Sequence, residues 1–199
     1  MLTKKKLITS VLACLLISPT LVLSDTCLTI KAEENSGLLI PGDANTCNQV
    51  RQTLKASGRF PTVFPAHQSP RLYPGICFVS SQEGIHAMLG QREVLVQSIS
   101  AWTIDYKPFL LAPYFGPEFT ESMASVISQW TVTDVARNRV LGKVYTTDAI
   151  NLNQFSELDV ILGGTDRFLG TRGETRIDSA PNPDGTVNII GINGSVCMP

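Results

Sequence analysis

The chain has 199 residues, with 16 Lys and Arg against 17 Asp and Glu and a formal net charge of −1. This length suits one domain with its own core and is too short for two domains of ordinary size. A chain without excess positive charge is not built to wrap nucleic acid or to coat an anionic membrane, so neither partner is expected.

The first 24 residues have the layout of an export signal. Three lysines at positions 4–6 precede a mostly apolar run over 7–23, and aliphatic or small residues lead up to Ser24. A membrane anchor would need about 20 unbroken apolar residues, whereas polar residues and Pro19 interrupt this run. A lipoprotein signal ending at Cys14 would have too little apolar sequence before it. We predict cleavage near Ser24, a periplasmic or secreted protein, and no stable membrane span after cleavage.

Cleavage would leave 13 Lys and Arg against 17 Asp and Glu, a charge of −4, because the removed segment holds three lysines and no acid. It would also leave four cysteines, which in an oxidising compartment predict two disulfides with three alternative connectivities. The preferred pairing joins Cys27 to Cys47 and Cys77 to Cys197. Zinc is disfavoured because no two cysteines are close in sequence and the chain has only two histidines. We expect no metal and no cofactor.

Residues 25–88 are predicted to form an irregular N-terminal arm that the disulfides hold against the rest of the protein. Prolines recur throughout this segment, and such spacing is unfavourable for long regular elements. The one candidate for a short helix runs from Thr46 to Ser57. The prolines are Pro41, Pro61, Pro65, Pro70 and Pro74.

Residues 89–199 are predicted to form an antiparallel β-barrel or a sandwich. Their short segments are rich in Val, Ile, Thr and aromatic residues, and polar turns separate them. In one segment Val126, Trp130 and Val132 share a face with Ser128, the period of two that a strand requires. Evenly spaced strands with polar connections are typical of all-β barrels and sandwiches. The predicted strands are 92–104, 124–134, 139–150, 157–162, 171–178 and 186–192.

The stretch "GGTDRFLGTRG", residues 163–173, connects two of these strands. A phosphate-binding loop would be followed at once by a helix N-terminus, which the sequence does not predict here. Gly163 and Gly164 at a strand end indicate a bulge or a close approach of two backbones. Phe168 is expected to fold back as an apolar plug, and Gly173 closes the corner. We interpret this stretch as a structural turn.

These residues carry a family resemblance. The segments "VLGKVYTTDAI" and "ELDVILGGTDRFLGTRGETRI", with their Gly-Gly-Thr-x-x-Phe-x-x-x-Arg-Gly pattern, resemble the allene oxide cyclase barrel and the dirigent proteins. The resemblance is good over residues 122–192 and loose over 89–121. It implies an eight-stranded antiparallel β-barrel, and a homotrimer, since family members are often trimers. Asp166 replaces a glycine of the family, and aspartate tolerates the left-handed conformation better than most residues.

The resemblance also implies functions. Dirigent proteins bind phenoxy radicals and guide their coupling, and allene oxide cyclases close a reactive fatty-acid epoxide inside the barrel; both act largely by positioning a substrate. In dirigent proteins an arginine after the glycine corner lies in the pocket, and Arg172 matches it. Arg172 would donate charged hydrogen bonds to a ligand. The alternative is that Arg172, Glu174, Arg176 and Asp178 form a solvated outer face.

Trp130 and Tyr145 have two interpretations each, and Asp148 has one. Trp130 is expected to point inward, as a core residue or as a ligand-binding one. Tyr145 is a candidate proton donor or a packing residue, and Asp148 is interpreted as a turn former.

Three functions stay open at this point. The first is an exported barrel that binds a small apolar molecule, with Trp130 and Arg172 in the pocket. The second is a cyclase or isomerase that uses Arg172 and Tyr145 without a metal or redox cofactor. The third is a structural protein whose barrel is filled by side chains. A wide cavity would favour the first two, and a filled lumen the third.

Overall fold

The computed structural model describes residues 26–59, 72–103, 123–151 and 154–199. The predicted signal, residues 1–24, lies outside these ranges. Within them, no helix is long and apolar enough to cross a membrane. The elements are β1 (Thr26–Ala32), β2 (Gly37–Pro41), α1 (Ala44–Ala56), β3 (Leu72–Ser80), β4 (Ile85–Leu89), β5 (Arg92–Thr103), β6 (Met123–Asp134), β7 (Arg139–Asn151), β8 (Ser156–Gly164), the 3₁₀ turn η4 (Asp166–Phe168), β9 (Arg172–Pro181) and β10 (Val187–Met198).

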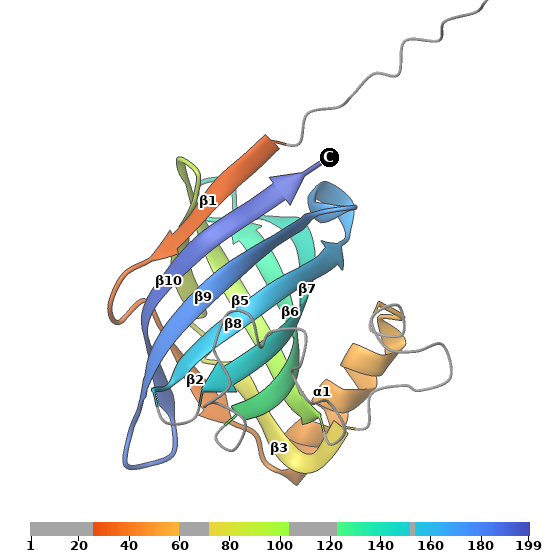
Figure 1. Cartoon of the computed structure of the whole chain (residues 1–199), viewed down its shortest axis with the longest axis vertical. Coiled ribbons are helices and arrows are strands. Elements are labelled where there is room, and N and C mark those ends of the chain that lie inside the picture. Colours follow the sequence, from red (N-terminus) through yellow and green to blue (C-terminus); the bar gives the residue numbers. More distant parts are fainter. Residues whose placement is uncertain (1–25, 60–71, 104–122, 152–153) are drawn as a thin grey trace, which may run out of the picture.

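The described strands form a closed antiparallel barrel with eight strand positions (Figure 1). Strands β5 to β10 each fill one position and follow one another around the wall. Pairing of β5 with β6 on one side, and of β10 with β1 and β2 on the other, closes the ring. A closed sheet leaves no long edge exposed to pairing with other chains. The predicted all-β barrel is therefore confirmed.

Two of the eight positions are each filled by two shorter strands. β1 pairs with the C-terminal half of β10 and β2 with its N-terminal half, so that Ala32 lies opposite Ile192 and Gly37 opposite Ile189. In the same way, β3 and β4 pair with the two halves of β5. Each position is thus a strand interrupted by a turn.

This arrangement corrects the expectation that residues 25–88 form an irregular arm and that the barrel begins at residue 89. The segment contributes four strands and a helix to the fold. Pro41 stands at the last position of β2, where a proline removes no essential hydrogen bond of the sheet. Within β1, Ile30 and Ala32 are buried and Lys31 is exposed, so the alternation typical of a strand was present in this segment as well.

The two predicted disulfides are present, but the preferred pairing is wrong. Cys27 is bonded to Cys197 and Cys47 to Cys77. The first bond follows from the register of β1 and β10, which places these two cysteines directly opposite each other. The second fixes α1 to β3, with Cα atoms 5.3 Å apart. Strand pairing and helix docking decided the connectivity, and neither can be deduced from the spacing of cysteines.

Helix α1 covers the outside of the barrel near one end, as Figure 1 shows. Asp43 caps its N-terminus by accepting a hydrogen bond of 2.7 Å from the Thr46 backbone N–H. Val50 and Leu54 lie one turn apart on the buried face and pack against the wall. The helix confirms the one predicted in this segment, and it gives the outer surface of the barrel a small second core.

Candidate functional site

The inner faces of β7 and β8 change character along their length. On β7, Val144 belongs to the apolar core of the lumen, whereas Asp148, four residues further on the same face, does not. Asp159 of β8 lies directly opposite Asp148, and Glu157 takes the next inward position on β8. Strand alternation thus directs three acidic side chains into one region of the lumen. We call Asp148, Glu157 and Asp159 the carboxyl cluster.

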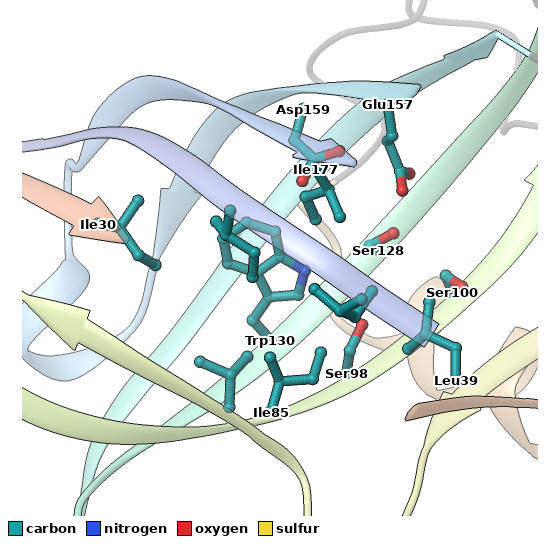
Figure 2. Close-up of a pocket in the computed structure, with 13 residues that line it drawn as sticks. Ile30, Leu39, Ile85, Ser98, Ser100, Ser128, Trp130, Glu157, Asp159 and Ile177 are labelled. Atoms are coloured by element: carbon teal, nitrogen blue, oxygen red, sulfur yellow. The ribbon is translucent and has the colours of Figure 1, made fainter. Parts of the chain in front are cut away.

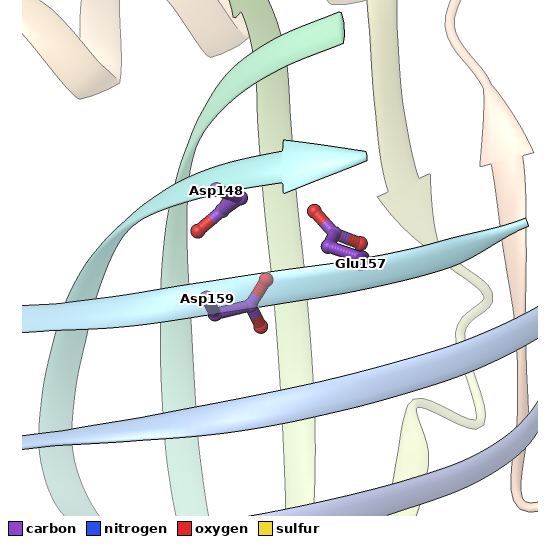
Figure 3. Close-up of side chains that lie close together, drawn as sticks. All are labelled: Asp148, Glu157 and Asp159. Atoms are coloured by element: carbon purple, nitrogen blue, oxygen red, sulfur yellow. The ribbon is translucent and has the colours of Figure 1, made fainter. Parts of the chain in front are cut away.

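The three carboxylates converge (Figure 3). One oxygen from each lies within 4.8 Å of an oxygen of the other two. Asp148 and Asp159 are each only 1% exposed, and Glu157 is half-buried. The Ser128 hydroxyl donates to Asp148 Oδ2, and the Thr175 hydroxyl donates to Asp159 Oδ2 at 3.0 Å. These two hydroxyls fix the orientation of the carboxylates from the neighbouring strands β6 and β9.

Burial dominates the electrostatics of the cluster. It raises the pKa of Asp148 from 3.8 to about 7, although the hydrogen bond from Ser128 favours the charged form. Burial also raises the pKa of Asp159 well above its ordinary value, and repulsion from Asp148 and Glu157 adds to the effect. The pKa of Glu157 is raised by burial and by the neighbouring Asp148. The cluster therefore holds protons near neutral pH unless another positive charge replaces them.

A small cavity adjoins the cluster inside the barrel (Figure 2). Its volume is about 30 Å³, enough for about two water molecules. Glu157 and Asp159 line it together with Trp130 and the hydroxyls of Ser98 and Ser128. The rest of its wall is mostly aliphatic, from Ile30, Leu39, Ile85, Val96, Ile177, Ile189 and Ile192. The lumen between the described residues is thus nearly filled and polar at one side.

The structure places the residues predicted to form a site in three different environments. Trp130 points into the lumen and lines the cavity. Tyr145 is buried on the opposite face of β7, in the small core beneath α1 with Leu54 and Ile127, and burial raises the pKa of its phenol. It therefore faces away from the lumen, contrary to the role of proton donor to a ligand there.

Arg172 also lies outside the lumen. Arg172, Glu174 and Arg176 are exposed. Thr175 and Ile177, which alternate with them along β9, are buried. This alternation corrects the expectation of a pocket arginine, because β9 turns its charged positions outward. The alternative interpretation, in which these charged residues form a solvated outer face, agrees with the structure.

The glycine corner has the structural form that its sequence predicts. A Cβ on Gly164 would lie 2.2 Å from the Lys143 carbonyl oxygen, and one on Gly173 would lie 2.1 Å from that of Ser195, so both positions exclude a side chain. A register shift between β7 and β8 falls beside Gly163. Phe168 is 1% exposed and packs into the lumen core. Asp166 adopts φ of +52°, the left-handed conformation expected for it.

Sequence reasoning missed the carboxyl cluster. Asp148 is not the turn former that its sequence context predicts, because it lies within β7 at a fully enclosed position. Asp159 and Glu157 occur in "ELDVIL", a segment whose apolar residues predict a strand and not a site. The available signal was their spacing: two acids at alternate positions of one barrel strand must share a face.

No protein-family model matches the chain, and no curated protein matches it. Among solved structures, the chain has a low similarity to a pterocarpan synthase dirigent protein, with 10% sequence identity and a TM-score of 0.37. The aligned region covers 87% of this chain and 88% of that one.

Proposed function

We propose that the protein is an exported binding protein whose barrel lumen takes a small polar or positively charged ligand at the carboxyl cluster. One observation carries the proposal: three acidic side chains converge beside an internal cavity. Among the described residues that line this cavity, none is Lys, Arg or His. The ligand would supply the positive charge that the described lining of this cavity lacks.

The energetic argument favours a site over simple filling. Burying a carboxylate without a counter-charge costs several kcal/mol even after the protein relaxes. A barrel that only needs a core is filled more favourably by aliphatic residues, as the other half of this lumen is. Three buried acids in one place therefore support binding over the filled-barrel interpretation.

The size of the cavity changes the expected class of ligand. A volume of about 30 Å³ suits water molecules or an ion, whereas pockets for drug-sized ligands occupy about 300–1,000 Å³. The apolar molecule expected from the sequence fits this lumen less well than a small polar one. An export location agrees with the two disulfides, which persist in oxidising compartments.

A second candidate is an isomerase that transfers a proton at the cluster. Its support is that Glu157 and Asp159 border the cavity while the Asp148 carboxyl, whose pKa is about 7, stands beside them. A carboxyl group with that pKa exchanges protons readily near neutral pH. Under this candidate Asp148 would act in place of Arg172 and Tyr145.

Native mass spectrometry of protein purified from the exported fraction tests the proposal. Wild type is compared with Asp148→Asn/Asp159→Asn and with Arg172→Ala, a change on the exposed face of β9. We expect a bound species in wild type and in Arg172→Ala that is absent from the double variant. A bound species kept in the double variant, or none in wild type, would refute a lumen site. The same spectra count the subunits and so test the proposed homotrimer.

A further inference from the structure

We propose that Asp148, Glu157 and Asp159 bind a divalent cation inside the barrel, and that Ca²⁺ is the ion that fits them best. The proposal rests on the proposed function, since it names the ligand of the same lumen site. It stands on the donor atoms, their unused hydrogen-bonding capacity, their spacing and the adjoining cavity.

The donors are all oxygen. Three carboxylates come from two adjacent strands, with Asp148 and Asp159 directly opposite each other. Neither cysteine nor histidine belongs to this group, and all four cysteines of the described chain are in disulfides. Oxygen ligands suit hard cations such as Ca²⁺ and Mg²⁺ and are a poor match for the nitrogen and sulfur preference of zinc. The expectation that no metal is bound rests on the spacing of the cysteines and on the two histidines, and these three acidic side chains lie outside that argument.

Unused acceptors point into the cluster. Oδ1 of Asp148 and Oδ1 of Asp159 are buried and have no hydrogen bond of good geometry among the described residues, although the neighbouring carboxyls are close enough to share protons with them. Nearby, the Thr146 hydroxyl is fully buried next to the Asp148 carboxyl, without a hydrogen bond of good geometry in the described chain. Buried polar atoms are nearly always satisfied by protein, water or an ion. Poor hydrogen-bond geometry at three buried oxygens on one lumen face is what a site that binds an ion or water would show.

The tolerance of its coordination favours Ca²⁺ over Mg²⁺. One oxygen of each carboxylate lies within 4.8 Å of the other two, an upper limit that admits either ion. An ion bound at about 2.3–2.6 Å, the Ca²⁺ distance, bridges oxygens up to about 5 Å apart, whereas Mg²⁺ at about 2.0–2.1 Å bridges about 4 Å and requires near-ideal octahedral geometry. Two rigid neighbouring strands are better suited to the ion with the more tolerant coordination.

The cavity supplies the remaining ligands. It is bordered by Glu157 and Asp159 and has room for about two water molecules, which Ca²⁺ commonly retains among its six to eight oxygens. Ser98, Ser100 and Ser128 present hydroxyls around the same space. The charge balance is also favourable, because a divalent cation leaves the three ionised carboxylates with a net charge of −1.

The test is calorimetric titration of CaCl₂ and of MgCl₂ into EDTA-treated, dialysed wild-type protein, with thermal unfolding midpoints measured in EDTA and in millimolar CaCl₂. We expect saturable Ca²⁺ binding with a dissociation constant of about 0.1–1 mM, as in extracellular modules, weaker Mg²⁺ binding, and an unfolding midpoint raised by Ca²⁺.

Three variants locate the site. Asp148→Asn/Asp159→Asn and, separately, Glu157→Gln should weaken Ca²⁺ binding at least about tenfold, in the range seen when metal sites lose a supporting group. Both changes remove charge from a crowded cluster, so the EDTA-treated variants should unfold at or above the wild-type midpoint. Glu174→Gln removes the same charge from the exposed face of β9 and should bind Ca²⁺ like wild type.

The proposal is overturned if wild type shows no saturable Ca²⁺ binding, or if the cluster variants bind Ca²⁺ as tightly as Glu174→Gln does. Its failure is distinguishable from failure of the proposed function. A bound organic species lost from Asp148→Asn/Asp159→Asn would keep the lumen site and remove the metal.

Discussion

The two halves of the barrel lumen are lined by the same strands and have opposite chemistry. In the apolar half, Val132, Leu141, Val144 and Phe168 pack together. In the acidic half, the carboxyl cluster occupies the equivalent inward positions of β7 and β8. The difference arises within four residues, from Val144 to Asp148. Strand alternation decides whether a side chain faces the lumen. The residue type at each inward position decides whether that part of the lumen is apolar or acidic.

The two halves also contribute with opposite sign to stability. Burying aliphatic and aromatic side chains stabilises the fold by roughly 1.5–3 kcal/mol for each large residue. Burying carboxylates without a counter-charge costs stability. A closed barrel of eight strand positions, with two disulfides in the chain, can tolerate that cost, and sites of function are where such local conflicts are expected.

The largest effect is expected in the apolar half. Phe168→Ala should lower the free energy of unfolding by about 3–5 kcal/mol, because a fully buried phenylalanine leaves a cavity that the closed barrel cannot collapse to fill. Urea unfolding followed by tryptophan fluorescence measures the change. Leu169→Ala is the matched control, since its neighbouring side chain is 62% exposed and should contribute within about 0.5 kcal/mol. Equal losses in the two variants would contradict the burial of Phe168.

The acidic half should make stability depend on pH. The folded protein raises the pKa of Asp148 to about 7, so this group binds a proton more tightly folded than unfolded. Its contribution is fully present below about pH 4 and is lost as the pH rises through about 7. Between about pH 5 and pH 7, the free energy of unfolding in EDTA should fall by about 2 kcal/mol from this group alone.

Urea unfolding of wild type and of two variants across this pH range distinguishes the contribution of the carboxyl cluster from that of the other titrating groups. Asp148→Asn should make the fall shallower, because asparagine does not titrate while Asp159 and Glu157 still do, whereas Glu174→Gln should reproduce the wild-type profile. A wild-type protein that becomes more stable from pH 5 to pH 7, or an unchanged profile in Asp148→Asn, would contradict the raised pKa.

The contrast between the halves also shows what the sequence could predict. The alternation of Val126, Trp130 and Val132 predicts β6 and places Trp130 and Val132 on one face, the face that lines the lumen core, and the Gly163–Gly173 stretch predicts its corner. These features depend on residues close in sequence.

The features that sequence reasoning missed depend on residues far apart. Cys27 meets Cys197 only because β1 pairs with β10 across a separation of 170 residues. Asp148 meets Asp159 only through the register of β7 and β8, which a bulge near Gly163 shifts by one residue. A single acidic residue on a strand does not predict a site. The site can be recognised only when the strand register places a second acidic residue opposite the first.

The smallest effect on stability and on Ca²⁺ binding is expected from Arg172→Ala. This variant tests whether the outer face of the barrel wall contributes to the lumen site. Arg172 is exposed on β9, whereas Thr175, three residues later, donates to Asp159 inside the lumen. The substitution should change the free energy of unfolding by no more than about 0.5 kcal/mol and leave Ca²⁺ titration unchanged. Thr175→Val, a matched change on the inner face, should weaken Ca²⁺ binding because Asp159 loses the hydroxyl that orients it. Weaker Ca²⁺ binding by Arg172→Ala than by Thr175→Val would contradict this assignment. It would place Arg172 in the binding site, as the family resemblance implies.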